Sequence, residues 1–388
     1  MGAMTGVAGG AVPQAGWGIS LARMNALEIR PGCAIAGPGA LLRDVQAEAA
    51  RAGQFYPPDP TENTSSIGGN IAANASGSRS FKFGSTRDYV AALRVALMDG
   101  RVIETRRGES VDFDVPSIRL PRTTKHSAGY RLAPGMDLVD LFVGCEGTLG
   151  VVTRAQLRLL PAPGELTGGV VFFPSEEAAL DAVDRWRPAG LRMLEYLDEA
   201  SLRMMEVAQR AALIIEWEGD VDVDMTGALE DESWFAVSAA DRERFRKFRQ
   251  ALPERVNDRI RRSGFMKLST DYAVPIEKGR EMLAIYRKSI RSEHVIFGHV
   301  GDAHLHVNTF SASPREFEEN KVLMTDLARA AVALGGTVGA EHGLGKRKAH
   351  LLAIQYSEQE IESMRAVKRR FDPQWLLGQG TLLRYEAV

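Results

Sequence analysis

The sequence predicts an α+β protein with two domains, and three observations support that expectation. First, the 388 residues exceed the usual size of a single domain. Second, 45% of the residues are hydrophobic and 25% are charged, a balance typical of chains that bury proper cores. Third, apolar runs of strand length alternate with amphipathic segments of helical period. We therefore expect two packed domains rather than a disordered chain.

The first part of the chain predicts strands, one helix and long polar stretches. Apolar runs at 17–24 and 26–31 have the composition of strands, and 93–98 and 101–107 predict a hairpin. Asp-Gly is a strong signal for a tight hairpin turn, and it joins these last two runs. A helix is predicted by apolar residues at helical spacing: Leu41, Leu42, Val45 and Ala49. A Pro-Ala-Pro-Gly turn at 161–164 marks the boundary between domains 1–162 and 163–388.

The second part predicts helices packed on a mostly antiparallel sheet. Buried-strand patterns occur at three places, 168–174, 191–198 and 212–219. A further strand is expected near 270–275. A helix is expected after Ser175, which is a good N-cap residue, and further helices are expected at 200–211 and within 220–262. Strands and helices mixed in this way indicate an α+β layer.

Bulk charge and cysteine content limit the classes of function. The chain has 48 Lys and Arg against 50 Asp and Glu, a net charge of -2. It therefore lacks the excess of basic residues that would indicate a nucleic-acid partner. The two cysteines, Cys33 and Cys145, lie far apart, which fits a reducing compartment without a disulfide framework. No apolar run approaches the length of a membrane span. We expect a cytoplasmic protein, and weak peripheral attachment to a membrane stays open.

One polar stretch, residues 57–90, has the composition of a ligand-binding segment. It contains four glycines, three asparagines and many Ser and Thr residues, which favour turns and allow close approach to the main chain. A linker is the alternative, but a linker would not be expected to contain the apolar residues Ile67, Ile71, Phe81 and Phe83. We expect backbone N–H groups here to line an anionic cofactor. Residues 1–13 and 120–150 are also glycine-rich, although a loose terminus is the alternative for the former.

The clustering of histidines predicts where the chemical site lies. Five of the seven lie between His299 and His350. Strand geometry would place His304, His306 and Asn308 on one face, and a turn at Gly301-Asp302 could return His299 beside them. Glu341-His342 lies between glycines further along. Imidazole and carboxylate groups suit Zn²⁺ or another divalent ion, so we expect a metal or catalytic site rather than isolated structural histidines.

These motifs resemble the FAD-linked oxidases related to vanillyl-alcohol oxidase, in the branch of D-lactate dehydrogenase, glycolate oxidase and D-2-hydroxyglutarate dehydrogenase. The segments PPDP at 57–60 and SIGGNIAANASG at 66–77 match that branch nearly letter for letter, as do EGTLGV at 146–151 and EHGLG at 341–345. The resemblance implies an FAD-binding domain of the PCMH type (type 2), followed by the C-terminal domain of FAD-linked oxidases. The family has a strand-helix-strand unit before its first glycine loop, and this sequence begins at that loop, so we expect the domain without that unit.

The resemblance also assigns residues to the flavin. We expect them in the N-terminal glycine loop, the 57–90 stretch and the turn before the last strand of the first domain: Gly2, Thr5, Gly6, Gly9, Gly10, Pro57, Ser66, Gly68, Gly69, Asn70, Asn74, Gly77, Glu146, Gly147, Gly150 and Val151. The metal ligands implied are His299, His306 and Glu341, with zinc the expected metal. His304 stands where some members have Asn, so it is expected to neighbour the ligands.

The remaining implied roles concern substrate and proton transfer. His342 is expected to be the general base, while Arg249, Lys267 and Asn308 are expected to contact the substrate. The expected reaction is FAD-dependent oxidation of a D-2-hydroxy acid. Two alternatives stay open: a flavoenzyme acting on another alcohol, and a non-catalytic flavin-binding subunit of a larger oxidase. The electron acceptor is open among a quinone, a cytochrome, an electron-transfer flavoprotein and oxygen, and a homodimer and an oxidase complex are both compatible with the sequence.

Overall fold

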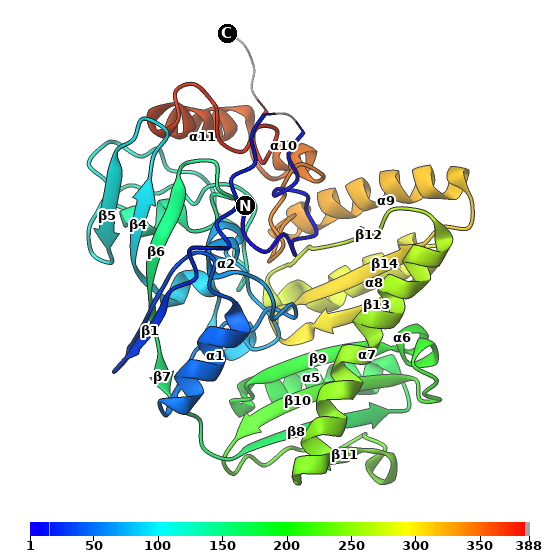
Figure 1. The fold of residues 1–388 in the computed structure, drawn as a ribbon. Coiled ribbons are helices and arrows are strands. Elements are labelled where there is room, and N and C mark those ends of the chain that lie inside the picture. Colours follow the sequence, from blue (N-terminus) through cyan, green and yellow to red (C-terminus); the bar gives the residue numbers. More distant parts are fainter. Residues whose placement is uncertain (15, 385–388) are drawn as a thin grey trace.

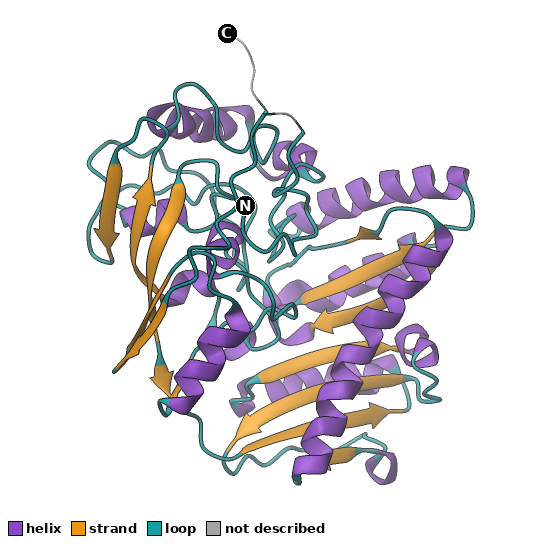
Figure 2. Ribbon diagram, in the orientation of Figure 1, coloured by secondary structure: helices purple, strands orange, loops and turns teal. Residues whose placement is uncertain are grey.

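The computed structural model describes residues 1–14 and 16–384, which form two antiparallel sheets with helices around them (Figures 1 and 2). The first sheet has the order β1-β2-β6-β4-β5, with strands Leu27–Arg30, Cys33–Ala36, Val151–Arg158, Val90–Ala96 and Val102–Arg106. The β4–β5 hairpin predicted from Asp99-Gly100 is confirmed, and Gly100 has the positive φ (89°) that the turn requires. A small pair, β3 (Gln54–Phe55) with β7 (Leu160–Pro161), lies beside it.

Short helices accompany the first sheet, and the end of the chain returns to it. They are α1 (Leu42–Arg51), α2 (Ile67–Ala73), α3 (Ser80–Phe83), α4 (Leu138–Phe142), α10 (Leu352–Gln355) and α11 (Glu358–Phe371). The helix predicted from Leu41 to Ala49 is confirmed as α1. At the end of α11, Phe371 packs edge to face against Phe142 of α4, with ring centroids 5.5 Å apart. Figure 1 shows α11 over one end of β4 and β5.

The second sheet is larger and antiparallel throughout, which confirms the predicted class. Its order is β11-β8-β10-β9-β13-β14-β12, with strands Trp234–Ala236, Leu166–Phe173, Ala211–Glu218, Met193–Asp198, Glu293–His299, His304–Phe310 and Leu268–Ser269. Helices α5 (Glu176–Trp186) and α8 (Gly279–Ser289) cover one face, and α7 (Ala239–Ser263) crosses the other (Figure 1). Successive side chains of β10 point to opposite faces of the sheet. Leu213 and Ile215 join the core with α5, while Ala212 and Ile214 pack toward α7. Helices α6 (Glu199–Met204) and α9 (Pro314–Ala333) complete this part.

Several local predictions were wrong. Residues 17–24 form no strand: Trp17 is 98% exposed, so this apolar run has no sheet to pack on. The helix expected over 200–211 ends at Met204, since Glu206 takes a left-handed conformation with φ 64°. The helix expected within 220–262 begins only at Ala239, where Ser238 and Asp241 form a capping box. Residues 270–275 contribute two isolated bridges, from Ala273 to His304 and to Thr337, rather than a strand.

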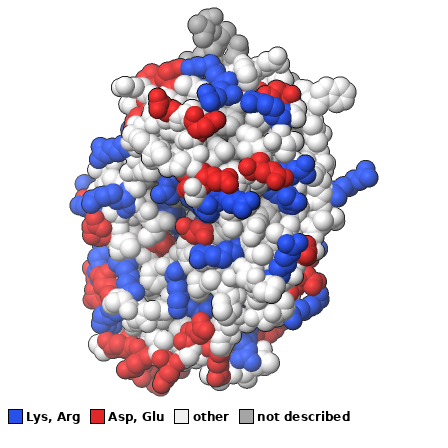
Figure 3. Space-filling model, turned by 90° about the vertical axis from the view of Figure 1, so that its left-hand side faces the viewer, with Lys and Arg blue, Asp and Glu red and all other residues white. Residues whose placement is uncertain are grey.

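Charges of both signs mix on the surface. Figure 3 shows Lys and Arg side chains interspersed with Asp and Glu over the face seen from the left of Figure 1. This mixture agrees with the nearly equal totals of 48 cationic and 50 acidic residues. Within the described part of the chain, no helix is both long enough and apolar enough to cross a bilayer.

Candidate active site

Three histidines meet where β13 turns into β14. A single 3₁₀ turn, Val300–Asp302, joins the strands, and their register pairs His299 with His304 and Phe297 with His306. The ring centroids of His304 and His306 lie 4.4 Å apart, and those of His299 and His306 lie 5.5 Å apart. The alternation and the turn expected from the sequence are both confirmed.

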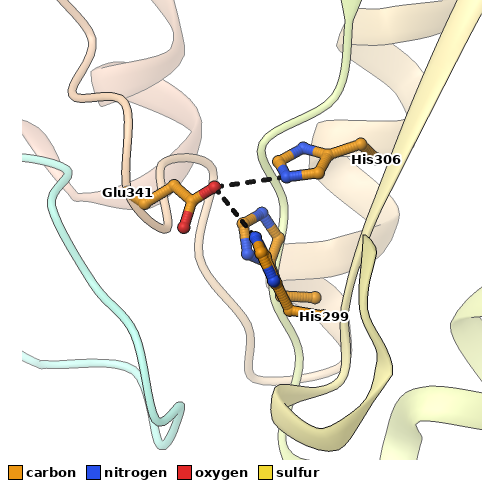
Figure 4. A group of neighbouring side chains, drawn as sticks. His299, His306 and Glu341 are labelled. Atoms are coloured by element: carbon orange, nitrogen blue, oxygen red, sulfur yellow. Dashed lines mark hydrogen bonds and ion pairs between the residues drawn. The ribbon is translucent and has the colours of Figure 1, made fainter. Parts of the chain in front are cut away.

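Glu341 approaches these histidines from the loop after α9. Its Oε1 lies 3.3 Å from Nε2 of His299 and 3.2 Å from Nε2 of His306 (Figure 4). Its Oε2 accepts hydrogen bonds from Lys125 Nζ at 2.9 Å and Ser76 Oγ at 3.2 Å. Burial opposes ionisation of this carboxyl, but Lys125 and His299 outweigh it and hold the pKa of Glu341 well below its usual range.

The donor set fits a divalent metal. Four buried residues, His299, His304, His306 and Glu341, offer ligand atoms within 4.8 Å of one another. His306 Nδ1 lies 3.2 Å from the Thr270 carbonyl oxygen, which only a ring N–H can satisfy, and this arrangement directs Nε2 toward Glu341, where it could bind a metal. Imidazole nitrogens with one carboxylate are ordinary Zn²⁺ ligands. A second group, Asp271, His306 and His342, shares that same His306 and is therefore not an independent site.

His342 lies at the edge of this cluster and is 30% exposed. Its Nδ1 is 3.2 Å from Asp271 Oδ1, and its Nε2 is 3.7 Å from Glu341 Oε1. Burial is the main cause that lowers the pKa of His342 to about 4, so the ring is neutral near pH 7. A neutral ring that faces a carboxylate with one nitrogen can accept a proton at the other nitrogen.

The three residues expected to contact substrate lie in different surroundings. Arg249, on α7, donates from Nε to Glu195 at 3.0 Å and also bonds Ser78 of the glycine-rich stretch. Asn308 is buried on β14, on the face that carries His306, and its Oδ1 has no partner among the described residues. Lys267 is exposed and donates to Asn257 on α7 at 3.2 Å, so its described contact lies outside the histidine cluster.

Three functional neighbours were missed from the sequence: Lys125, Asp271 and Glu195. Lys125 lies in the glycine-rich stretch 120–150 and Asp271 in the segment expected near 270–275, which was the available signal, whereas Glu195 lies in an ordinary buried strand. Glu195 contacts His299 Nδ1 at 3.0 Å and Arg249, and although burial opposes its charge, Arg249 and His299 lower its pKa to about 2. Burial and Lys125 disfavour the charged form of His299, but Glu341 and Glu195 raise its pKa to about 9.

The residues expected at the flavin converge around α2. This helix was not predicted within the turn-rich stretch; Ile67 and Ile71 bury one side of it, and Ser66 caps it by accepting from Gly69 N. The N-terminal glycine loop packs on its first turn, where Ala3 N donates to Ser66 Oγ at 3.2 Å. Further along, the loop reaches the segment after His342, where Lys346 N and Arg347 N each donate to Ala8 O at 3.1 Å.

Some expected flavin residues have their side chains engaged by the protein. Asn74 accepts from Arg87 N at 2.9 Å and donates to the His126 carbonyl. Glu146 accepts from Leu344 N and Gly345 N at 2.9 and 2.8 Å. Gly77 leaves no room for a side chain, because an added Cβ would lie 1.9 Å from the Asp59 carbonyl oxygen.

The same stretch retains a donor for an anionic cofactor. Asn70 Nδ2 is buried within α2 and has no hydrogen-bond partner among the described residues. A buried amide without a partner is costly, and an acceptor on a ligand would satisfy it. The N–H groups of Gly68 and Gly69 are already engaged, by the Pro38 carbonyl at 2.9 Å and by Ser66 Oγ at 3.3 Å, so the fit to an anionic ligand rests on Asn70 Nδ2. The residues present therefore fit FAD.

Comparison with known proteins identifies the family. Residues 1–106 match the model described as FAD binding domain, and residues 163–382 match FAD linked oxidases, C-terminal domain. A D-lactate dehydrogenase of Anaerostipes hadrus is 30% identical, with 98% of this chain and 83% of that protein covered. Glycolate oxidase subunit GlcD of Bacillus subtilis is 31% identical, with 90% and 75% covered.

Another relative and a solved structure agree with this match. A D-lactate dehydrogenase of Archaeoglobus fulgidus is 31% identical, with 98% of this chain and 84% of that protein covered. Among solved structures, alkyldihydroxyacetonephosphate synthase has a TM-score of 0.63 at 16% identity, covering 97% of this chain and 71% of that one, which indicates the shared fold. The chain therefore belongs to the FAD-linked oxidases and is an FAD-dependent oxidoreductase.

Proposed function

We propose that this oxidoreductase converts a D-2-hydroxy acid, of the D-lactate, glycolate or D-2-hydroxyglutarate type, into the 2-oxo acid. The observation that supports this most is the convergence of His299, His306 and Glu341 beside His342. The names of the relatives agree, since they include D-lactate dehydrogenases and glycolate oxidase subunits. A 2-hydroxy acid offers a carboxylate and an adjacent hydroxyl, two oxygens that suit such a site.

His299, His306 and Glu341 would hold a divalent metal, with zinc the best match to the donors. When bound, that metal would stabilise negative charge developing on the substrate oxygen. When bound at residues 1–10, 57–77 and 146–151, FAD would accept the hydride. Electrons would then leave to a quinone, a cytochrome, an electron-transfer flavoprotein or oxygen.

The remaining steps belong to the side chains of this chain. His342, neutral near pH 7, would accept the hydroxyl proton at Nε2. Arg249 and Lys267 would attract the substrate carboxylate. Asn308, whose acceptor Oδ1 has no partner among the described residues, would contact the hydroxyl group of the substrate. The buried Lys125 keeps Glu341 ionised and thus able to serve as a ligand.

An anaerobic absorbance titration tests the proposal. The flavin band of the purified chain should bleach with D-lactate, glycolate or D-2-hydroxyglutarate, and much less with L-lactate. His299→Ala should abolish bleaching and lower the metal content measured by mass spectrometry. His294→Ala is the matched control, because His294 lies at the other end of β13 with Nδ1 on the Ser292 carbonyl. A flavin that no 2-hydroxy acid bleaches would contradict the proposal and favour either another alcohol substrate or a non-catalytic subunit.

The assembly is a separate part of the proposal. Two of the relatives are named as oxidase subunits, so a complex with other chains is one candidate, and a homodimer is the other. Mass photometry of the purified chain, alone and with candidate acceptor proteins, distinguishes these states.

A further inference from the structure

Asp271 is a carboxylate beside the candidate base, and its side chain has no exposed area (0%). It lies between β12 and the isolated bridges at Ala273, directly behind the Glu341-His342 loop. Its Oδ2 accepts the backbone N–H of His342 at 3.0 Å and that of Glu341 at 3.4 Å. One oxygen of this carboxylate therefore fixes the backbone of both residues.

The other oxygen faces two imidazole rings. Asp271 Oδ1 lies 3.2 Å from His342 Nδ1 and 3.2 Å from His304 Nε2. All three atoms are buried, and none of them has a hydrogen bond of ordinary geometry to a described residue, so these 3.2 Å contacts are the closest polar contacts they have. An ionised carboxylate oxygen only accepts, so a neutral ring facing it is stabilised with the proton on the facing nitrogen.

The preceding residue acts in the same way on the neighbouring ring. The Thr270 carbonyl oxygen lies 3.2 Å from His306 Nδ1, which places the proton on that nitrogen. Two consecutive residues, Thr270 and Asp271, thus face the Nδ1 atoms of His306 and His342. The stacked rings of these histidines, with centroids 5.3 Å apart, consequently present Nε2 toward Glu341.

We propose that Asp271 is a positioning residue, which holds His342 in the tautomer that has its proton on Nδ1 and its lone pair on Nε2. Its role in catalysis rests on the proposed function, in which Nε2 of His342 accepts the hydroxyl proton. The tautomer itself is a property of this chain with or without turnover. A merely structural Asp271 would tie the loop backbone and leave the choice of tautomer unaffected.

Asp198 supplies a matched control. It is equally buried, at 1% exposure, and likewise accepts a backbone N–H, from Ser201 at 2.8 Å. It also pairs with a cation, Arg287, at 3.0 Å, but its described contacts include no histidine. Asp271→Asn and Asp198→Asn therefore each remove one buried negative charge that supports a backbone turn, and only the first one touches His342.

Nitrogen NMR of the full chain with ¹⁵N-labelled histidine measures the tautomer directly, and His342→Gln assigns the signals. We expect a protonated Nδ1 and an unprotonated Nε2 in the native protein. In Asp271→Asn the new amide can donate to Nδ1, so the pattern should reverse or become mixed, while Asp198→Asn keeps the native pattern. A native His342 with its proton on Nε2 would overturn the proposal, even if Asp271→Asn failed to fold. An unchanged pattern in folded Asp271→Asn would do so too.

Stopped-flow flavin reduction by D-lactate tests the consequence for catalysis. Asp271→Asn should slow reduction by about 100-fold or more, as loss of the orienting carboxylate does in Asp-His pairs, with the dissociation constant of D-lactate changed by less than about threefold. Asp271→Glu should recover part of the rate. A rate equal to that of Asp198→Asn would refute the positioning role. If D-lactate, glycolate and D-2-hydroxyglutarate all fail to reduce native flavin, the proposed function fails, while the tautomer measurement still decides the placement.

Discussion

A buried lysine helps to keep the carboxylate of the candidate metal site ionised. Lys125 is 1% exposed, lies 2.9 Å from Glu341 and also donates to the Gly77 carbonyl at 3.1 Å. A buried carboxylate without such a partner would take up a proton rather than stay charged. Lys125 therefore contributes to the site through Glu341, although it comes from the segment between β5 and α4.

Glu146 is the residue for which we predict a pH-dependent stability. Burial raises the pKa of Glu146 from 4.5 to about 7, although Leu344 N and Gly345 N favour its charged form. The folded state thus holds this proton more tightly than the unfolded state does. Stability should therefore fall as pH rises from about 4.5 to about 7, by roughly 1–3 kcal/mol, and stay low above that.

Glu146→Gln tests this prediction, because glutamine keeps an acceptor oxygen and cannot ionise. The melting temperature of the native protein should fall more steeply over this pH range than that of the variant. Parallel curves for the two proteins would contradict the raised pKa. Both curves should be measured on the chain with its bound flavin, so that cofactor loss is detected in the same scan by flavin fluorescence.

The sequence predicted the histidines of the site but not their polar neighbours, because the histidines lie close together in the sequence and the neighbours do not. His299, His304 and His306 lie on one hairpin, where strand alternation and a Gly-Asp turn determine their geometry. Lys125 and Glu341 are 216 residues apart, and no periodicity relates them. Contacts of that kind form only when both sheets and their loops have packed.

At the scale of elements, α2 shows how close packing sets residue choice. An added Cβ on Gly68 would lie 2.6 Å from Pro38 Cβ and 3.0 Å from the Pro38 carbonyl oxygen, whereas at Gly69 the nearest atom is Ser66 Oγ at 3.1 Å. Gly68→Ala should therefore cost roughly 1–3 kcal/mol of unfolding free energy. Gly69→Ala should cost little, because the helix gains about 0.5–1 kcal/mol from alanine. Urea unfolding of the flavin-free chain measures the unfolding free energy of both variants. Equal losses would show that Pro38 moves aside and accommodates the added Cβ.

The same helix explains which predictions of elements failed. The stretch at 57–90 has the glycine and polar content of turns, and yet Ile67 and Ile71, four residues apart, bury one side of α2. The run at 17–24 failed in the opposite way. Its apolar residues suit a strand, but it forms none, and Trp17 and Ile19 are 98% and 68% exposed. Composition alone predicted the wrong structure in both places because tertiary packing decided it.

At the scale of the whole molecule, a chain of buried and partly buried ion pairs connects the two parts of the molecule. Arg79, at the start of α3, donates two hydrogen bonds to Glu216 of β10, at 2.8 and 2.9 Å, and one to Asp59 at 2.7 Å. Arg192 donates to the same Glu216 at 3.1 Å. Asp59 also lies 3.9 Å from Arg249, which reaches Glu195 and so His299. The contact between the two parts of the molecule thus extends to the candidate active site.

Glu216→Gln is predicted to weaken this contact, since it leaves Arg79 and the 1%-exposed Arg192 with less compensating charge. Removing one partner of a buried pair commonly costs about 3–5 kcal/mol, and the remaining Asp59 and Glu218 should hold the loss near 3 kcal/mol. Glu104→Gln is the control, because Glu104 is 65% exposed and its pairs with Arg94 and Arg154 should contribute less than about 1 kcal/mol. Urea unfolding followed by tryptophan fluorescence measures both variants. Equal losses in the two would mean that the buried pairs contribute no more to stability than surface pairs do, and that apolar packing alone joins the two sheets.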